Sequence, residues 1–440
     1  MTTISTCGAP PATTTTTTFV DRWPHLAEVP RGVRAGAGRL VAAALFRRAA
    51  QRLALRVELP DGTMFGGGVD DPTAPRMLLH DPDAFATRLG ATGLIGFGEA
   101  YMTGDWSAPD PTAVLTVLAS DLSALVPAPL QALRPLFLPG QPSRTRATPA
   151  GARSNAAHHY DLSNDFFALF LDETMTYSSA LFDRLDPAPE WDALAAAQHA
   201  KIDRLLDATN VGPGSSVLEI GTGWGELAIR AAQRGATVRS VTLSAQQLVL
   251  AQQRVAAADL ADRVTIELRD YRDVEGSYDA VISVEMIEAV GYEYLTDYLT
   301  VLERLLAPGG HVAVQVITMP HDRMRASRAT HTWVQKYIFP GGFLPSEELL
   351  AQLLSRHTDL EQVDRSAMGQ HYAHTLRLWQ DRFTAADAQV GALGFDEVFQ
   401  RMWRLYLAYS EAGFRSGYLD ALQLILRRSS SAELDAVVAR

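Results

Sequence analysis

The chain lacks the features that would place it in several large classes of protein. It has 440 residues but a single cysteine, Cys7, so no disulfide can form within it. No apolar run of about 18 residues occurs, which argues against a membrane-spanning helix. No basic segment followed by an apolar one begins the chain, so we expect no secretory signal. The net charge of −11 argues against general nucleic-acid binding. With 47% hydrophobic residues, we expect a cytoplasmic protein with a sizeable core.

The first 60 residues differ in composition from the rest of the chain. Residues 1–18 include six consecutive threonines and predict a disordered tail. Residues 19–60 carry eight arginines against three acids, although the whole chain is acidic. Apolar residues between Leu40 and Leu55 alternate with Arg47, Arg48 and Arg52. A basic amphipathic helix of this kind is typical of a membrane surface. A helix packed in its own domain with its arginines in water explains the pattern equally well.

Turn signals and linker composition divide the remainder. Glycine and proline clusters at 60–62 and 66–68 indicate a small mixed domain, and we assign residues 19–138 to it. Residues 139–152 are rich in proline, glycine, serine and arginine and predict a linker. Residues 153–440 then form the catalytic part. His158, His159 and Asp161 lack the further ligand spacing of a metal site, so we expect no metal.

The most informative segment lies at residues 217–225, which read Val-Leu-Glu-Ile-Gly-Thr-Gly-Trp-Gly. An apolar strand carries Glu219 near its end, and three alternating glycines, Gly221, Gly223 and Gly225, lead into a helical pattern. Glycine allows positive φ angles and a close approach of the backbone to a ligand. The dinucleotide fingerprint G-x-G-x-x-G is not matched, because the third glycine comes one residue early. The E-x-G-x-G-x-G spacing is instead typical of S-adenosylmethionine (SAM) methyltransferases.

Strands and helices alternate from about residue 215 to 317, which predicts an α/β domain with a parallel sheet. Such sheets bind ligands at the carboxyl ends of their strands. The predicted strands are 216–220, 236–243, 264–268, 278–284 and 311–317.

Seven motifs follow one another along the chain: 159–164 (His-Tyr-Asp-Leu-Ser-Asn), 176–178 (Thr-Tyr-Ser), the glycine segment, 242–244 (Thr-Leu-Ser), 287–291 (Ile-Glu-Ala-Val-Gly), 337–342 (Tyr-Ile-Phe-Pro-Gly-Gly) and 371–373 (His-Tyr-Ala). In these motifs, residues 155–428 resemble the cyclopropane-fatty-acid synthase and mycolic-acid methyltransferase family. Within it, the chain is most similar to the branch that makes 10-methylene fatty acyl chains, precursors of tuberculostearic (10-methylstearic) acid; the cues are 240–244, 283–291 and 409–418. The resemblance implies a class I SAM-dependent methyltransferase fold, Rossmann-like with a mostly parallel seven-stranded sheet. It also implies a smaller lipid-associated N-terminal domain, because residues 98–106 resemble the N-terminal domain of longer cyclopropane synthases.

The resemblance also implies how SAM is bound. The Gly221–Gly225 turn would approach the cofactor, with Glu219 near its polar end. Thr242 and Gln247 would take the place of the acidic residue that holds the ribose in related enzymes, although a helix cap and a solvated side chain are the alternative. Tyr271 would lie on the adenine, and Tyr177 and Ser178 would close the pocket.

The chemistry implied is methylation of an acyl-chain alkene through a carbocation, in a site that must be dry. Tyr177 and Tyr372 are candidates for cation–π stabilisation. A base must then remove a proton from the added methyl group. In most of the family this base is a bicarbonate held by a cysteine, a glutamate, a histidine, an isoleucine backbone and a tyrosine.

This sequence keeps three of the bicarbonate ligands, Glu288, Ile317 and Tyr372, but has Ser179 and Gln315 in place of the cysteine and histidine. Both replacements can donate hydrogen bonds to an anion, so bicarbonate stays a candidate cofactor. Glu288 is the alternative base, unless it is a surface carboxylate at a helix start.

The expected reaction is therefore SAM-dependent methylation of an unsaturated, oleoyl-type phospholipid to a 10-methylene chain. A cyclopropane product is the main alternative, and a small-molecule methyltransferase or an inactive lipid-binding subunit are the rivals. The expected partners are the membrane, met peripherally at its inner face, and a reductase for the methylene product. The oligomeric state is left open.

Overall fold

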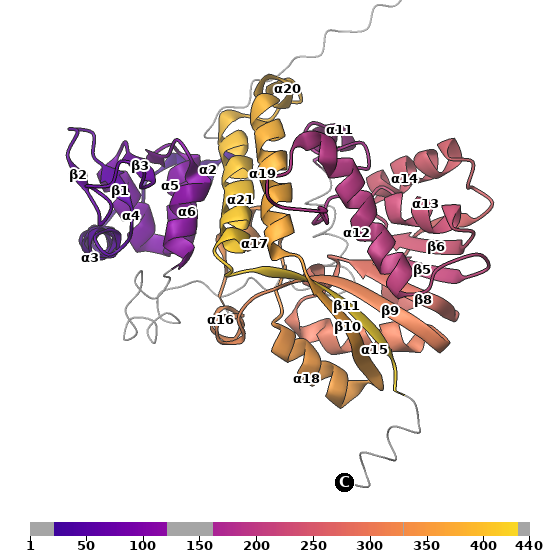
Figure 1. Ribbon diagram of the computed structural model, residues 1–440. Helices are drawn as coiled ribbons and strands as arrows, with labels where there is room; N and C mark the ends of the chain where they lie inside the picture. The colour runs from indigo at the N-terminus through magenta and orange to yellow at the C-terminus, as the bar shows by residue number, and fades with distance from the viewer. Residues whose placement is uncertain (1–21, 121–161, 329, 430–440) are drawn as a thin grey trace, which may run out of the picture.

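The computed structural model describes residues 22–120, 162–328 and 330–429. The predicted tail at 1–18 and linker at 139–152 lie outside these residues, as do His158, His159 and Asp161. Two sheets organise the described chain, one of four strands and one of seven. Figure 1 shows the smaller sheet and its helices at one side, the larger sheet at the other, and two long helices between them.

The larger sheet has the strand order β10-β11-β9-β8-β5-β6-β7. Strand β11 runs antiparallel to both of its neighbours, and all the other pairs are parallel. The predicted class I methyltransferase architecture, with its mostly parallel seven-stranded sheet, is confirmed. The bounds are β5 Ser216–Ile220, β6 Thr237–Thr242, β7 Val264–Leu268, β8 Tyr278–Val284, β9 Leu306–Thr318, β10 Leu360–Ala367 and β11 Asp420–Arg428.

Helices cover both faces of this sheet, as a parallel sheet with buried, apolar strands requires. One face packs against α12 (Leu194–Ala208), α13 (Glu226–Gln233) and α14 (Ala245–Ala257). The other packs against α15 (Leu295–Arg304) and α18 (Glu347–His357). Shorter helices are α11 (Asn164–Ala168), α16 (His321–Ser327) and α17 (Trp333–Tyr337).

The N-terminal unit has the strand order β2-β1-β3-β4. Its core joins Phe46, Val57, Met77, Phe85 and Trp106, all of them buried. Its strands are β1 Arg56–Glu58, β2 Met64–Phe65, β3 Arg76–Leu79 and β4 Trp106–Ser107, and its helices are α2 Pro24–Ala27, α3 Val33–Ala50, α4 Pro82–Thr92, α5 Leu94–Met102 and α6 Pro111–Ser120.

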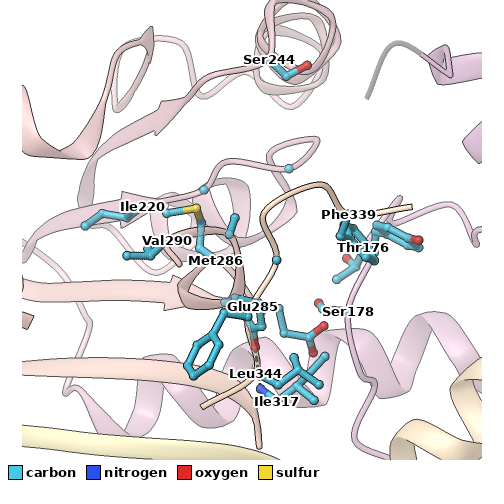
Figure 2. Close-up of a pocket in the computed structure, with 18 of the residues that line it drawn as sticks. Thr176, Ser178, Ile220, Ser244, Glu285, Met286, Val290, Ile317, Phe339 and Leu344 are labelled. Carbon is cyan, nitrogen blue, oxygen red and sulfur yellow. Dashed lines mark hydrogen bonds between the residues drawn. The ribbon is translucent and has the colours of Figure 1, made fainter. Parts of the chain in front are cut away.

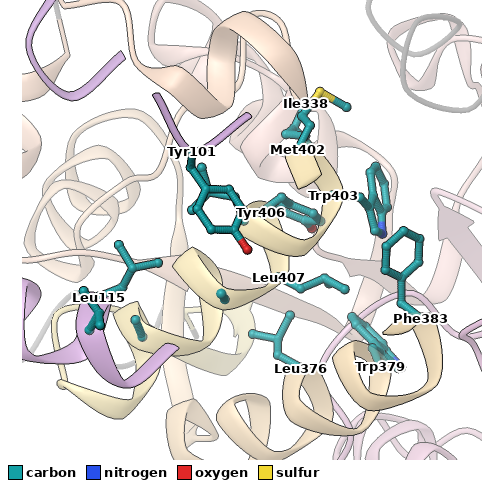
Figure 3. Packing of buried hydrophobic residues seen from close by; sticks show 14 of the residues in the cluster. Tyr101, Leu115, Ile338, Leu376, Trp379, Phe383, Met402, Trp403, Tyr406 and Leu407 are labelled. Atoms are coloured by element: carbon teal, nitrogen blue, oxygen red, sulfur yellow. The ribbon is translucent and has the colours of Figure 1, made fainter. Parts of the chain in front are cut away.

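Helices α19 (Gly369–Ala385) and α21 (Glu397–Arg415) join the two parts, with α20 (Asp387–Ala392) between them in sequence. Figure 3 shows Tyr101 and Leu115 of the N-terminal unit on one side of α21, and Trp379 and Phe383 of α19 on the other. Phe399, Trp403, Tyr406 and Phe414 of α21 are buried here. Because one hydrophobic cluster runs through both parts, they pack as a continuous body.

Helix α17 docks on α5 of the N-terminal unit. A Cβ atom on Gly98 would come within 2.4 Å of the Trp333 ring, so only glycine fits there. The Tyr337 hydroxyl donates a hydrogen bond of 2.8 Å to Glu99, which also pairs with Lys336. The side chains of Trp333, Lys336 and Tyr337 therefore form part of an interface between the two parts.

The basic segment forms helix α3, which has a packed and an exposed side. Phe46, Ala49 and Ala50 are buried in the N-terminal core. Leu40 and Val41 are 65% and 58% exposed, and Arg48 and Arg52 also face solvent. The helix therefore belongs to its own domain and also presents apolar and basic side chains to water. Across the described ranges, no helix is both long and apolar enough to cross a bilayer.

Candidate active site

A cavity of about 410 Å³ opens at the carboxyl ends of the central strands of the larger sheet. In Figure 2, Ser244 lies at one end of the lining residues and Ile317 and Leu344 at the other, with Glu285 nearer the latter. We refer to the part near Ser244 and the glycine segment as the cofactor end, and to the part near Glu285 and Ile317 as the base end.

The glycine segment forms one wall of the cofactor end. Gly221, Gly223 and Gly225 have φ angles of +95°, +53° and +91°, a region that favours glycine. A Cβ on Gly223 would meet no protein atom within 4 Å, since it would point into the cavity. A Cβ on Gly221 would lie 2.8 Å from Met286.

Gly225 differs in position from the other two glycines of the segment. It is the residue at the start of α13, it faces Ala251, and it does not line the cavity. Its glycine is explained by the turn into the helix and by close packing rather than by contact with a ligand.

The other residues predicted at the cofactor end are brought together as expected. Glu219, Thr242, Gln247 and Tyr271 all line the cavity. Burial raises the pKa of Glu219 to about 8, and the Ser240 hydroxyl donates to its carboxylate at 2.6 Å.

Thr242 and Gln247 form a polar pair rather than a helix cap. The Thr242 hydroxyl donates to the Gln247 side chain at 3.0 Å, and both residues are buried. Ser244 is the residue that caps α14, because its side chain accepts from the Gln247 backbone. The alternative of a solvated Gln247 is therefore wrong.

The segment before the sheet closes the cavity from the opposite side. Tyr177 and Ser178 line it, and the Tyr177 hydroxyl lies 2.8 Å from the hydroxyl of Tyr406. Behind Ser178 lies Lys201, only 1% exposed, whose ammonium donates to the Ser178 hydroxyl at 2.5 Å. Burial lowers the pKa of Lys201 to about 8. Lys201 was not among the predicted site residues.

The base end contains a carboxylate that the motifs did not single out, Glu285. Three groups donate hydrogen bonds to it: the Ser179 backbone at 3.0 Å, the Gln315 side chain at 2.8 Å and the Tyr372 hydroxyl at 2.6 Å. Burial raises the pKa of Glu285, and the hydrogen bond from Tyr372 is the largest opposing effect. Ser179 acts through its backbone only, because its hydroxyl donates to the Ala180 carbonyl.

Glu288 also faces the cavity, beside Glu285. Its Oε1 accepts a hydrogen bond of 2.5 Å from the Ile317 backbone, and its Oε2 is enclosed without a hydrogen-bond partner. Burial, and then the charge of Glu285, raise the pKa of Glu288 to about 8. The alternative of a surface carboxylate at a helix start is therefore wrong.

The predicted catalytic residues thus fall into two layers. Glu288, Ile317 and Tyr372 line the cavity, whereas Ser179 and Gln315 are fully buried behind Glu285. One signal for Glu285 was present in the sequence, since it directly follows the central strand β8. Within the described ranges, no group of three His, Cys, Asp or Glu side chains is arranged to hold a metal.

The cofactor end fits SAM, because a cradle of positive-φ glycines with open space at Gly223 adjoins buried polar side chains. Glu219, Thr242, Gln247 and Tyr271 would hold the cofactor there. Fold and site together define a class I SAM-dependent methyltransferase.

Comparison with known proteins gives the family. The family model described as mycolic acid cyclopropane synthetase matches residues 148–424. The chain is 58% identical to the tuberculostearic acid methyltransferase UfaA1 of Mycobacterium tuberculosis, over 93% of this chain and 96% of that one. It is 34% identical to the cyclopropane-fatty-acyl-phospholipid synthase of Escherichia coli K12, over 80% of this chain and 87% of that one. The chain therefore belongs to the cyclopropane synthase family.

A solved structure agrees with this assignment. The mycolic acid cyclopropane synthase CmaA1, in complex with SAH and CTAB, superimposes with a TM-score of 0.57 at 32% identity. The match covers 63% of this chain and 98% of that one.

Proposed function

We propose that this enzyme methylates the double bond of an oleoyl-type acyl chain in a phospholipid and yields a 10-methylene acyl chain. The observation that carries the proposal is a single cavity with a cofactor cradle at one end and paired carboxylates at the other. The 58% identity to a tuberculostearic acid methyltransferase supports this branch of the family over the cyclopropane synthases.

The walls between the two ends suit the expected intermediate. SAM supplies the methyl group, and its transfer to an alkene leaves a carbocation on the acyl chain. Tyr177, Phe339, Tyr372, Tyr406 and Phe414 line this part of the cavity. Their ring faces can stabilise a cation, and their bulk keeps out the water that would trap it as an alcohol.

The product is decided by what the cation does before it loses a proton. A 1,2-hydride shift followed by proton loss gives a methylene group on the chain, whereas proton loss with direct ring closure gives a cyclopropane. The cyclopropane is the second candidate, favoured by the Escherichia coli relative.

Purified enzyme tests the proposal when it is incubated with SAM and vesicles of dioleoyl phosphatidylglycerol. We expect a mass gain of one CH₂ in the acyl chain, with vinylidene proton signals in the NMR spectrum of the extracted lipid. Ring-proton signals would overturn the methylene product in favour of the cyclopropane. Unchanged lipid, together with SAM binding in calorimetry, would overturn the acyl substrate itself.

We further propose that α3 contacts the anionic inner face of the membrane. Its support is the exposed pair Leu40 and Val41 on the same helix as Arg47 and Arg48, with Arg52 one turn beyond. Each basic residue near an anionic surface contributes about 1 kcal/mol. A reductase that saturates the methylene group of the chain is the partner this product would require.

Co-sedimentation with anionic vesicles tests the membrane contact. Replacing Arg48 and Arg52 by glutamate should weaken binding by about tenfold or more. The matched control replaces Arg325 and Arg356, which are exposed on α16 and α18, and changes the net charge equally. An equal loss in both variants would show that only overall charge matters, and would remove this role of α3.

A further inference from the structure

The groups that donate hydrogen bonds to Glu285 belong to residues that the sequence analysis assigned to a bicarbonate site. Residues 179, 315 and 372 were expected to hold a bicarbonate ion. In the structure all three instead donate to the Glu285 carboxylate, through the Ser179 backbone, the Gln315 side chain and the Tyr372 hydroxyl. The two other expected ligands, Glu288 and the Ile317 backbone, are bonded to each other. The chain's own carboxylate therefore occupies the place expected for a free anion.

The backbone of Glu285 has an unfavourable conformation that the surrounding structure must hold in place. Its φ angle is +49°, in the left-handed region that glycine favours and that side chains seldom adopt. The Glu285 amide donates to the Gln315 carbonyl at 2.8 Å, which fixes the turn beside β9. A strained residue held by surrounding hydrogen bonds is typical of functional sites.

We propose that Glu285 is the catalytic base, a built-in carboxylate that replaces bicarbonate in this enzyme. This inference rests on the proposed function. Hydrogen bonds from Tyr372, Gln315 and the Ser179 backbone favour the ionised carboxylate, and so does the nearby charge of Lys201. These contacts oppose the burial that raises the pKa of Glu285. Glu288, with a pKa raised to about 8, is the neutral neighbour that keeps the pair from carrying two charges.

The proton balance of this step is simple. After the hydride shift, a Glu285 oxygen forms a bond to a hydrogen of the added methyl group. The electron pair of that C–H bond becomes the new carbon–carbon π bond and neutralises the cation. Glu285 is left as a carboxylic acid, which returns its proton to water when the product leaves.

Glu285→Gly provides a direct test, because glycine suits the local backbone and removes the carboxylate together with the rest of the side chain. In bicarbonate-depleted buffer, the wild type should keep its full rate, whereas Glu285→Gly should be slower by about 10²–10⁴-fold. Added bicarbonate should restore turnover in the variant. Calorimetry should show bicarbonate binding to Glu285→Gly but not to the wild type, and SAM binding to both.

Asp259→Gly is the matched control. It also replaces an acidic residue at positive φ, +57°, but lies exposed after α14, so it should keep the wild-type rate. A full rate of Glu285→Gly without bicarbonate would overturn the assignment, as would a strong rate loss of the wild type on depletion. A wild-type protein that binds SAM but methylates no oleoyl lipid in either buffer would overturn the proposed function and the proton transfer with it. The bicarbonate titration would still decide whether Glu285 fills an anion site.

Discussion

The two ends of the cavity are built in different ways. The cofactor end is formed chiefly by a strand and the Gly221–Gly223 turn that follows it at once. The ends of two further strands of the same sheet complete it. The base end is assembled from distant segments, since Glu285 accepts hydrogen bonds from residues 106 positions earlier and 87 positions later. The cofactor end therefore depends on the local shape of the backbone, whereas the base end depends on contacts between residues far apart in the sequence.

This difference predicts that variants at the two ends affect different properties of the enzyme. Changes at the cofactor end should alter SAM affinity and leave the proton step intact. Changes at the base end should do the opposite. Any variant that affects both equally would break the distinction.

The largest effect is expected for Gly223→Val. A branched side chain would enter the cavity from a backbone with a φ angle of +53°, so SAM affinity should fall by about 100-fold or more. Isothermal titration calorimetry with SAM measures this affinity. Gly309→Val is the control, because Gly309 also has positive φ and open space but is exposed on β9. Equal SAM affinity in Gly223→Val and wild type would show that the cofactor lies elsewhere.

A smaller effect is expected for Tyr372→Phe at the base end. The variant keeps the ring, which stacks on Phe414 at 4.5 Å, and loses the hydroxyl that donates to Glu285. A hydrogen bond to a charged group contributes about 1.5–3 kcal/mol, so turnover should fall by about 10–100-fold. SAM affinity should not change. A loss of SAM affinity as large as the loss in rate would contradict the separation of the two ends.

Glu288→Gln should change how stability depends on pH. Folding raises the pKa of Glu288 from 4.5 to about 8, so within that range the folded protein keeps a proton that the unfolded chain releases. Stability then falls as pH rises, by about 1.4 kcal/mol per unit for one such proton. Glu219 retains a second proton in the same way, because its pKa is also raised to about 8. Lys201 changes the pH dependence of stability only above its lowered pKa of about 8.

Urea unfolding at about pH 5.5 and 7.5 measures this dependence. The variant should lose less stability than the wild type between the two values. Glu293→Gln, an exposed carboxylate, should behave like the wild type. Identical slopes for Glu288→Gln and wild type would mean that Glu288 is ionised in the folded protein.

The smallest effect is expected for Thr242→Val. The hydroxyl of Thr242 accepts from the Ser244 backbone and donates to Gln247, and valine removes both bonds without changing the shape. A net contribution of about 0.5–1.5 kcal/mol corresponds to a two- to tenfold weaker binding of SAM. Turnover at saturating SAM should be unchanged, and a reduced turnover would place Thr242 closer to the chemistry.

The sequence predicted the cofactor end well, because its signals are local. The strand and the alternating glycines each occupy a few consecutive residues, and β5, β7 and β8 have the predicted bounds. Gly225 lies at the start of α13 and outside the cavity lining, so its contact with the cofactor stays a prediction. Glu285 was missed for a different reason. Its importance depends on three donors from separate parts of the chain, and nothing in its immediate neighbours indicates where they will lie.

The docking of α17 on α5 has a consequence for the order in which the protein can be completed. Glu99 is 7% exposed, and its partners Lys336 and Tyr337 follow it by 237 and 238 positions. During synthesis, residues 22–120 leave the ribosome first, so this carboxylate and the notch at Gly98 stay uncovered until α17 emerges. Val334 and Gln335 of the same short helix line the cavity. Docking of α17 therefore covers part of the N-terminal unit and adds part of the active-site wall in the same step.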